Sequence, residues 1–405
     1  VERVNNPANG YTLLFIIILL LMGLGIATLF SASYYYGELK FDDPYFFLKR
    51  QLSMVGIGAL AGFCAARIPL EFLKRHTFSI VFISFLLTIS TFIPGIGQEI
   101  MGARRWIFVF GYSFQPSELV KFALVLYMAY ILSKKEDRIN DFINSIFPLL
   151  LVISIFVGLI YLQNDFSTAF FIFSIMIIML FVANIWFIYF LFLISVGLPL
   201  AGILLFTKEH RVQRIIAFLD PQSDPAGTGF QINAAHDALV NGGLWGSGAG
   251  EGMRKLGGLP EAHSDFVFAV LGEEMGFLGI FFVICVFVFF AYRGYMIAYH
   301  STDPFIYYFA FGLTTCVFYQ AMLNIAVVSG LVPATGIPLP FFSSGGSGID
   351  DSGGELDESP EYGAAPYDAA GYGAGPKPVK LLTLSTFRGS AGAYEPEIYD
   401  PEIID

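Results

Sequence analysis

A run of side chains suited to acid–base chemistry stands immediately before a long apolar segment. In Leu259-Pro-Glu-Ala-His-Ser-Asp265, the groups Glu261, His263, Ser264 and Asp265 end a long polar loop. Partial desolvation at the edge of a membrane raises the pKa of a carboxyl group and improves it as a general base. Asp265 is therefore a candidate base, although Asp is also a favoured helix N-cap residue. Both interpretations can hold together.

Two adjacent arginines and a spaced acid–base pair form a second cluster. Arg104 and Arg105 could bind phosphate oxygens in a bidentate manner, or they could be surface residues whose long side chains reach water. Glu118 and Lys121 have i, i+3 spacing, which predicts a structural ion pair on one helix face. Gln115, just before that predicted helix, is a supporting polar residue.

Three further carboxylates are candidates for supporting roles. Glu273 and Glu274 lie about two turns into the apolar segment that follows Asp265. A charge at mid-membrane costs roughly 2.5–3.5 kcal/mol, so we expect these groups to face a polar cavity or to bond to a neighbouring helix. Asp165, in Gln163-Asn-Asp-Phe-Ser-Thr168, fits a turn-and-cap residue.

The long loop between residues 207 and 264 has its own pattern. Residues 208–219 alternate basic and apolar positions at helical spacing, with Arg211 and Arg214 on one face. That pattern predicts a helix lying on the membrane surface near anionic groups. The later segment Gly242–Gly252 contains six glycines in eleven residues, which predicts tight turns and close backbone approach.

A segment near residue 340 should be irregular. Thr335–Ser347 contains two prolines and a Ser/Gly run that includes Ser343 and Ser344. Irregular backbone at membrane depth is tolerated only where it lines a cavity, so we expect this segment to do so. The chain carries no zinc-protease, P-loop, clustered-cysteine or G-x-S-x-G motif, so metalloprotease, ATPase and serine-hydrolase functions have no support.

Composition shows what must position these residues. The chain is 56% hydrophobic and 14% charged, whereas soluble domains are about 25% charged. This predicts an all-α, polytopic membrane protein, because an open strand cannot satisfy its backbone in lipid. Nine apolar runs are long enough to be candidate spans: 12–33, 52–69, 78–95, 117–133, 145–163, 167–184, 186–206, 265–292 and 305–331.

Charge divides the chain and orients it. Residues 349–405 hold 12 acidic and three basic residues and no span-length run, which predicts an atypical tail that is disordered or of foreign origin. The membrane domain is therefore residues 1–348. Basic residues in the short loops favour a cytoplasmic N-terminus, which places 96–116, 207–264 and 332–348 together on the outer face.

Eight motifs in order resemble the SEDS family of peptidoglycan glycosyltransferases, the FtsW and RodA proteins. They span about residues 10–348, and two details (Pro260-Glu-Ala-His263 and Gly272) resemble the division members, FtsW, more than RodA. The motifs are Gly102–Trp106, Gln115–Lys121, Gln163–Thr168, Gln213–Pro221, Gly243–Gly246, Pro260–Asp265, Gly272–Gly276 and Pro338–Gly346. Asn164 stands where the family usually has proline, and the acidic tail stands where its tenth helix should follow Gly346.

The resemblance implies a ten-helix enzyme of the bacterial inner membrane that polymerises lipid II into glycan strands. It places the essential aspartate at Asp265 and the buried salt bridge at Glu118 and Lys121. It implies a class B penicillin-binding protein as partner, other divisome or elongasome membrane proteins, and a divalent cation (Mg²⁺ or Mn²⁺) for the diphosphate, with no organic cofactor and no nucleic acid. The metal ligands stay unknown.

The expected reaction is inverting glycosyl transfer with undecaprenyl diphosphate as leaving group. Asp265 would be the base, with Arg104, Arg105, Arg211, Arg214, His263, Ser343 and Ser344 binding substrate. Two other functions stay open. A lipid II flippase is favoured by the intramembrane polar residues and the broken segment, and a non-catalytic divisome scaffold would only recruit a penicillin-binding protein.

Overall fold

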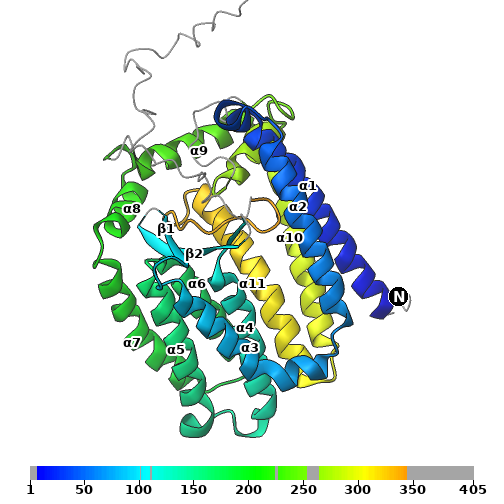
Figure 1. The fold of residues 1–405 in the computed structure, drawn as a ribbon, viewed down its shortest axis with the longest axis vertical. Helices are drawn as coiled ribbons and strands as arrows, with labels where there is room; N and C mark the ends of the chain where they lie inside the picture. Colours follow the sequence, from blue (N-terminus) through cyan, green and yellow to red (C-terminus); the bar gives the residue numbers. More distant parts are fainter. Residues whose placement is uncertain (1–6, 101, 110–111, 224–226, 253–263, 344–405) are drawn as a thin grey trace, which may run out of the picture. The chain divides into compact units, whose positions relative to one another are not determined.

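The computed structural model describes residues 7–100, 102–109, 112–223, 227–252 and 264–343 (Figure 1). The tail predicted for residues 349–405 lies outside these ranges, and so do Glu261, His263 and Ser344.

Long helices occupy all nine of the predicted apolar runs (Figure 1). Seven of them are long and apolar enough to cross a membrane. The other two are α6, which is apolar but has only 17 residues, and α2, which is not among the candidate spans. The all-helical membrane fold predicted from composition is confirmed. In the described residues these helices are α1 (Pro7–Phe41), α2 (Phe46–Arg67), α3 (Leu70–Ser90), α4 (Pro116–Lys134), α5 (Phe147–Leu162), α6 (Phe166–Val182), α7 (Phe187–Leu205), α10 (Val267–Tyr299) and α11 (Pro304–Val328).

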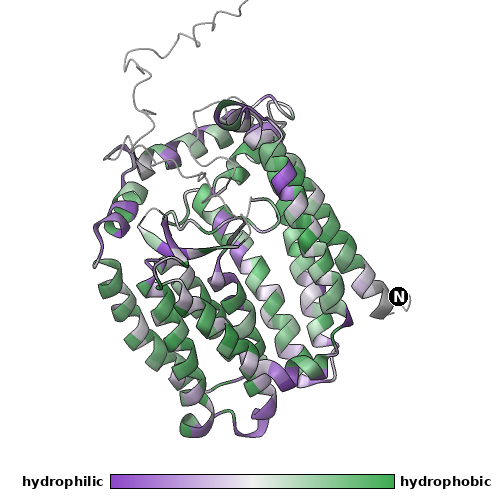
Figure 2. Ribbon diagram, in the orientation of Figure 1, coloured by the Kyte–Doolittle hydropathy of each residue, from purple (hydrophilic) through white to green (hydrophobic). Residues whose placement is uncertain are grey.

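Apolar residues make up most of the length of the helices, and polar residues gather toward the two ends of the bundle (Figure 2). Two buried clusters hold the bundle together. One is centred on α4, α5 and α6, and the other joins α1, α9 and α10. Helix α11 serves both, with Phe305 and Tyr308 in the first cluster and Ala321 and Ile325 in the second. It therefore runs through the middle of the molecule.

The loop between α3 and α4 holds a small sheet that the sequence patterns did not predict. Strands β1 (Gly97–Ile100), β2 (Ala103–Val109) and β3 (Tyr112–Phe114) form an antiparallel sheet in the order β1-β2-β3. The sheet stands at one end of the bundle (Figure 1), where β2 contacts α4. Its strands are too short for their alternation to stand out among longer apolar runs.

Two helices organise the described part of the loop after α7. The amphipathic helix predicted from residue 208 is present as α8 (Glu209–Leu219). A second helix, α9 (Thr228–Gly242), was not predicted, because its glycines and its polar residues hide the helical periodicity. Both lie at the same end of the bundle as the sheet (Figure 1), as expected for segments on one face of the membrane.

The glycine-rich turn after α9 packs into a break in α10. At Gly276 the α10 backbone has φ 64°, so the helix is interrupted. The freed carbonyls of Glu273 and Glu274 accept hydrogen bonds from the backbone N–H groups of Ser247 (2.9 Å) and Gly248 (3.1 Å). A Cβ atom on Gly246 would lie 2.1 Å from the Glu274 oxygen. The predicted close backbone approach is confirmed.

Replacing Gly246 by Ala should destabilise the protein by about 2–4 kcal/mol, because it adds a backbone clash to a strained φ of +83°. The measurement is the thermal unfolding midpoint in detergent. Gly243→Ala is the matched control, since Gly243 also has positive φ (+52°) but has open space around its Cβ position. It should cost about 1–2 kcal/mol. Equal shifts for the two variants would contradict the packing described.

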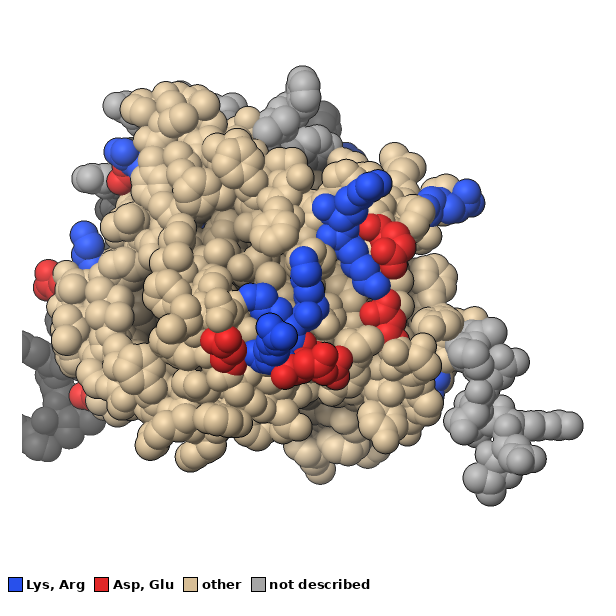
Figure 3. All heavy atoms as spheres, turned by 90° about the horizontal axis from the view of Figure 1, so that it is seen from below, with Lys and Arg blue, Asp and Glu red and all other residues tan. Residues whose placement is uncertain are grey.

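The opposite end of the bundle is rich in charge. Figure 3 shows basic and acidic side chains lying next to one another there. Lys74 of α3 pairs with Asp303 (2.5 Å), which caps α11 through the Phe305 N–H, and with Glu71 (3.3 Å). These contacts tie the α2–α3 connection to the α10–α11 connection.

Candidate active site

Asp265 stands just ahead of α10 rather than at its cap. The helix begins at Val267 with Phe266 in the N-cap position. The Asp265 backbone oxygen accepts a hydrogen bond from Asn324 Nδ2 of α11 (3.0 Å), and its side chain is half-buried. The capping role that the sequence allowed for Asp265 therefore does not describe this residue.

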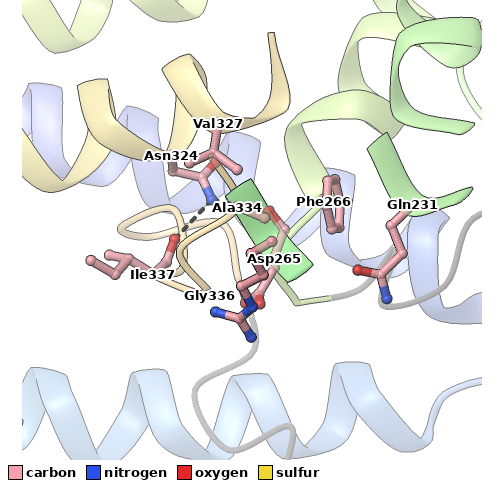
Figure 4. Close-up of a pocket in the computed structure, with 9 residues that line it drawn as sticks. Gln231, Asp265, Phe266, Asn324, Val327, Ala334, Gly336 and Ile337 are labelled. Carbon is pink, nitrogen blue, oxygen red and sulfur yellow. Dashed lines mark hydrogen bonds between the residues drawn. The ribbon is translucent and has the colours of Figure 1, made fainter. Parts of the chain in front are cut away.

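A small polar cavity of about 50 Å³ surrounds the Asp265 carboxylate. It brings together α8, α9, α11 and the broken segment after α11, and Figure 4 shows its walls. A cavity of this size admits only a few water-sized groups, such as a sugar hydroxyl rather than a whole sugar. The lining residues are Arg214, Gln231, Asp265, Phe266, Asn324, Val327, Ala334, Gly336 and Ile337.

Arg214 supplies the positive charge of this cavity. Burial lowers the pKa of its guanidinium, and the negative charge of Asp265 acts in the opposite direction. The charges of Arg105 and Asp165 also reach it. An arginine remains protonated at neutral pH despite such shifts. The cavity therefore combines a carboxylate with a partly desolvated cation.

A second polar cluster joins three residues that are far apart in the sequence. Arg105 Nη1 lies 3.3 Å from Asp165 Oδ2, and the Gln115 amide donates to the same oxygen at 3.2 Å. Asp165 also caps α6, because its Oδ1 accepts from the Thr168 N–H. The predicted cap is thus present, and the same carboxylate fastens the sheet to α6.

The neighbouring Asn164 has a backbone conformation that excludes proline at this position. Its φ is +64°, a conformation that the fixed ring of proline cannot adopt. Its amide donates to the Gly102 oxygen (2.8 Å), which adds another link between the sheet and the α5–α6 turn.

Removing Arg105 should destabilise the protein by about 1–3 kcal/mol, because Asp165 is buried and would lose its cation. The thermal midpoint of Arg105→Gln measures this. Asp165→Asn in the same chain should restore part of the loss, since the neutral amide needs no counter-charge. If the double variant is as unstable as both losses combined, the pair does not stabilise the sheet.

Arg104 and Arg211 lie outside the Asp265 cavity. Arg104 pairs with Glu99 across the sheet (2.8 Å) and lines a separate, open depression of about 290 Å³ with Gln163 and Asn164. Arg211 is buried, donates to the Leu204 oxygen (2.9 Å) and stacks over the ring of Tyr161. Arg211 and Arg214 share a helix, yet only Arg214 lines the cavity.

Glu118 and Lys121 form the ion pair that their spacing predicts, at 2.7 Å. Lys121 is buried while Glu118 is half-exposed. Lys121 Nζ also donates to Gln320 Oε1 of α11 at 3.0 Å. The pair is therefore connected to the helix that carries Asn324.

Comparison with known proteins places this architecture in a family. The sequence model of the cell cycle protein family that comprises FtsW, RodA and SpoVE matches residues 11–350. This chain belongs to that family. The match includes all eight motifs on which the resemblance rested.

Several relatives are similar over most of their length. A probable peptidoglycan glycosyltransferase FtsW of Borreliella burgdorferi is 42% identical over 86% of this chain and 94% of the relative. Stage V sporulation protein E of Bacillus subtilis is 39% identical over 83% and 92%. These relatives confirm the preference for FtsW-like members.

Two solved structures share the fold. One, described as the structural coordination of polymerization and crosslinking by a peptidoglycan synthase complex, superposes with a TM-score of 0.66 at 27% identity and covers 83% of this chain and 92% of that one. RodA of Thermus thermophilus superposes with a TM-score of 0.60 at 25% identity, over 83% and 90%.

Within this FtsW-like fold, other predicted residues are used for packing. Glu273 and Glu274 are buried beside the α10 break, and Ser31 of α1 donates to Glu274 Oε1 at 2.5 Å. Ser343 Oγ accepts from the Leu339 N–H and closes a turn in the broken segment. The Ser343 contact is local, whereas the Ser31–Glu274 bond joins α1 to α10. His263 and Ser344, which were predicted to bind substrate, lie outside the described residues.

Two polar side chains of the cavity were missed by sequence reasoning, those of Gln231 and Asn324. Asn324 did leave a signal, because an amide inside the apolar run 305–331 is costly unless it has a partner. Gln231 left none, since it reaches the cavity through the packing of α9, whereas Gly336 belongs to the Thr335–Ser347 segment that was predicted to line a cavity.

Proposed function

We propose that this chain polymerises lipid II into glycan strands, with Asp265 as the general base. The observation that carries the proposal is the single cavity shared by Asp265 and Arg214 at the membrane boundary of α10. The names of the FtsW relatives support the reaction class. The role of Asp265 as base is supported by its half-buried carboxylate, which can reach a substrate hydroxyl that enters the cavity.

The proposed step is an inverting transfer. The 4-hydroxyl oxygen of the acceptor sugar attacks the anomeric carbon of the donor while its proton passes to the Asp265 carboxylate. The bond from that carbon to the diphosphate oxygen breaks, and undecaprenyl diphosphate leaves with the electron pair. A diphosphate is a stable leaving group once its charge is neutralised, so no strong general acid is needed.

Arg214 is the cation best placed for that neutralisation, because it lines the Asp265 cavity. Arg105 is a second contributor, close enough for its charge to act on Arg214. Arg104 would contact the substrate only from the neighbouring depression.

A resident metal ion does not fit the described residues. Among them, no group of three or more His, Cys, Asp or Glu side chains could hold one, and Asp165 is already engaged by Arg105 and Gln115. Mg²⁺ also binds through substrate phosphates and one carboxylate. The predicted divalent cation would therefore enter with the diphosphate, and no step above depends on it.

The proposal extends to location and partner. The basic residues favour a cytoplasmic N-terminus, so the Asp265 cavity faces the exterior of the inner membrane. The solved synthase complex, which couples polymerization to crosslinking, supports a class B penicillin-binding protein as partner of this chain.

Reconstitution in vesicles distinguishes this function from a flippase. The purified chain with its penicillin-binding protein is supplied with lipid II, and both glycan polymer and transbilayer movement are measured. Polymer formation supports the proposal. Transbilayer movement without polymer supports the flippase. The absence of both polymer formation and transbilayer movement supports the scaffold.

A further inference from the structure

Two amide side chains on α11 lie one turn apart and bind consecutive carbonyls of the broken segment. Gln320 Nε2 donates to the Pro338 oxygen (3.0 Å), and Asn324 Nδ2 donates to the Ile337 oxygen (2.9 Å). Residues 333–339 have no helical or strand pairing. Their carbonyls therefore need side-chain donors, since an unpaired buried carbonyl costs about 1–3 kcal/mol.

Asn324 also bonds to Asp265, and so links the broken segment to that residue. The same Nδ2 group donates to the Asp265 backbone oxygen at 3.0 Å, and the Asn324 side chain is 1% exposed. The segment it holds also lies beside the carboxylate, since Gly336 and Asp265 line the same cavity and a Cβ atom added to Gly336 would lie 3.5 Å from Asp265 Oδ2. Figure 4 shows Asn324, Ile337 and Gly336 around Asp265. One amide therefore fixes both Asp265 and the wall beside it.

Gln320 links the broken segment to the Glu118–Lys121 ion pair of α4. Its Oε1 accepts from Lys121 Nζ (3.0 Å), and Lys121 is paired with Glu118. The contacts form one continuous chain that runs Glu118, Lys121, Gln320, the Ile337–Pro338 carbonyls, Asn324 and Asp265. This series of contacts joins α4 to the start of α10 through α11.

We propose that Gln320 and Asn324 are positioning residues for glycan polymerisation, and that through them the Glu118–Lys121 ion pair holds the Asp265 carboxylate in place. The inference rests on the proposed function. Neither amide needs to touch substrate. A misplacement of about 1 Å in a catalytic group can cost about 10²-fold in rate. Loss of these contacts should therefore lower kcat and leave KM nearly unchanged.

The test compares Asn324→Leu, which keeps a similar volume and removes the donor, with Gln320→Met and with the double variant. Each is assayed for lipid II polymerisation in complex with its penicillin-binding protein. Asn324→Leu should lower kcat by about 10–100-fold and leave KM for lipid II within about two-fold. Because both amides hold one segment, the double variant should lose less than the product of the single losses.

Thr315→Val is the matched control. Thr315 is a buried polar residue of the same helix that bonds to Phe311 and Tyr295, away from the chain of contacts. Its kcat should stay near the wild-type value. Thermal midpoints of all variants identify any protein that fails to fold. Asn324→Ala, which also removes the donor, should show the same loss of kcat as Asn324→Leu.

The outcomes separate this inference from the proposed function. If the wild type polymerises lipid II, Asp265→Asn does not, and the folded Asn324 variants keep wild-type kcat, the positioning role is wrong while the function stands. A change in KM alone, or fully multiplicative losses, also overturns it. If Asp265→Asn keeps its activity, the assignment of Asp265 as the base fails first, and the positioning role fails with it.

Discussion

Asp265→Asn should lower kcat for lipid II polymerisation by about 10²–10⁴-fold. The amide keeps the size of the carboxylate and its place beside Arg214, but it cannot take the proton of the attacking hydroxyl. The rate of polymer formation at saturating lipid II, measured with the penicillin-binding protein present, gives the value directly.

Binding should survive this change. The Asn324 bond to residue 265 is made to the backbone oxygen, so an asparagine side chain at this position leaves this bond in place. We expect a folded protein with a similar affinity for lipid II. Loss of binding with kcat preserved would assign Asp265 to substrate recognition instead of catalysis.

Arg214→Met should lower kcat by about 10²–10³-fold. The guanidinium is the cation of the Asp265 cavity, and charge builds up on the leaving diphosphate as the glycosidic bond forms. A partly desolvated cation interacts more strongly with that charge than one in water. Arg214→Lys should retain part of the rate, because it keeps the charge and loses the bidentate geometry.

Lys208→Met serves as the control for total charge. Lys208 precedes α8 and is exposed, so its loss removes a similar charge without changing the cavity. We expect a kcat close to that of the wild type. Equal losses from the Lys208 and Arg214 variants would show a general electrostatic effect on lipid II binding rather than a role in the reaction.

The helical framework could be predicted because lipid imposes it. Every predicted span became a helix, from α1 to α11, since an apolar run of that length has few other ways to pair its backbone. The helix α8 could also be predicted, from the helical spacing of its basic and apolar residues. These features are local, so a window of about 20 residues contains all the information needed.

The β sheet, α9 and the break in α10 depend on partners elsewhere in the chain. The glycines near residue 246 indicated a close approach, but not that the surface they meet is the interrupted turn at Gly276. Strands as short as β3 are stabilised by pairing with β2 rather than by their own sequence. Such contacts become visible only when both partners are placed.

The same limit applies to the candidate site. The residue types at Asp265 and Arg214 indicated acid–base chemistry and anion binding, and Asp165 indicated a helix cap. Their pairing was not predictable: Arg105 meets Asp165, and only one arginine of α8 lines the cavity. Asn324 lies 59 residues from Asp265 along the chain, so its role could come only from the packing of α11.

The most direct test measures undecaprenyl diphosphate release together with glycosidic bond formation. The purified chain, bound to its penicillin-binding protein with crosslinking blocked, is given lipid II. We expect one undecaprenyl diphosphate for each new bond, inversion at the donor's anomeric carbon, and neither product from Asp265→Asn. Lipid II that crosses the bilayer without diphosphate release would contradict the proposed function. An Asp265→Asn protein that polymerises at the wild-type rate would contradict the role of Asp265 as the base.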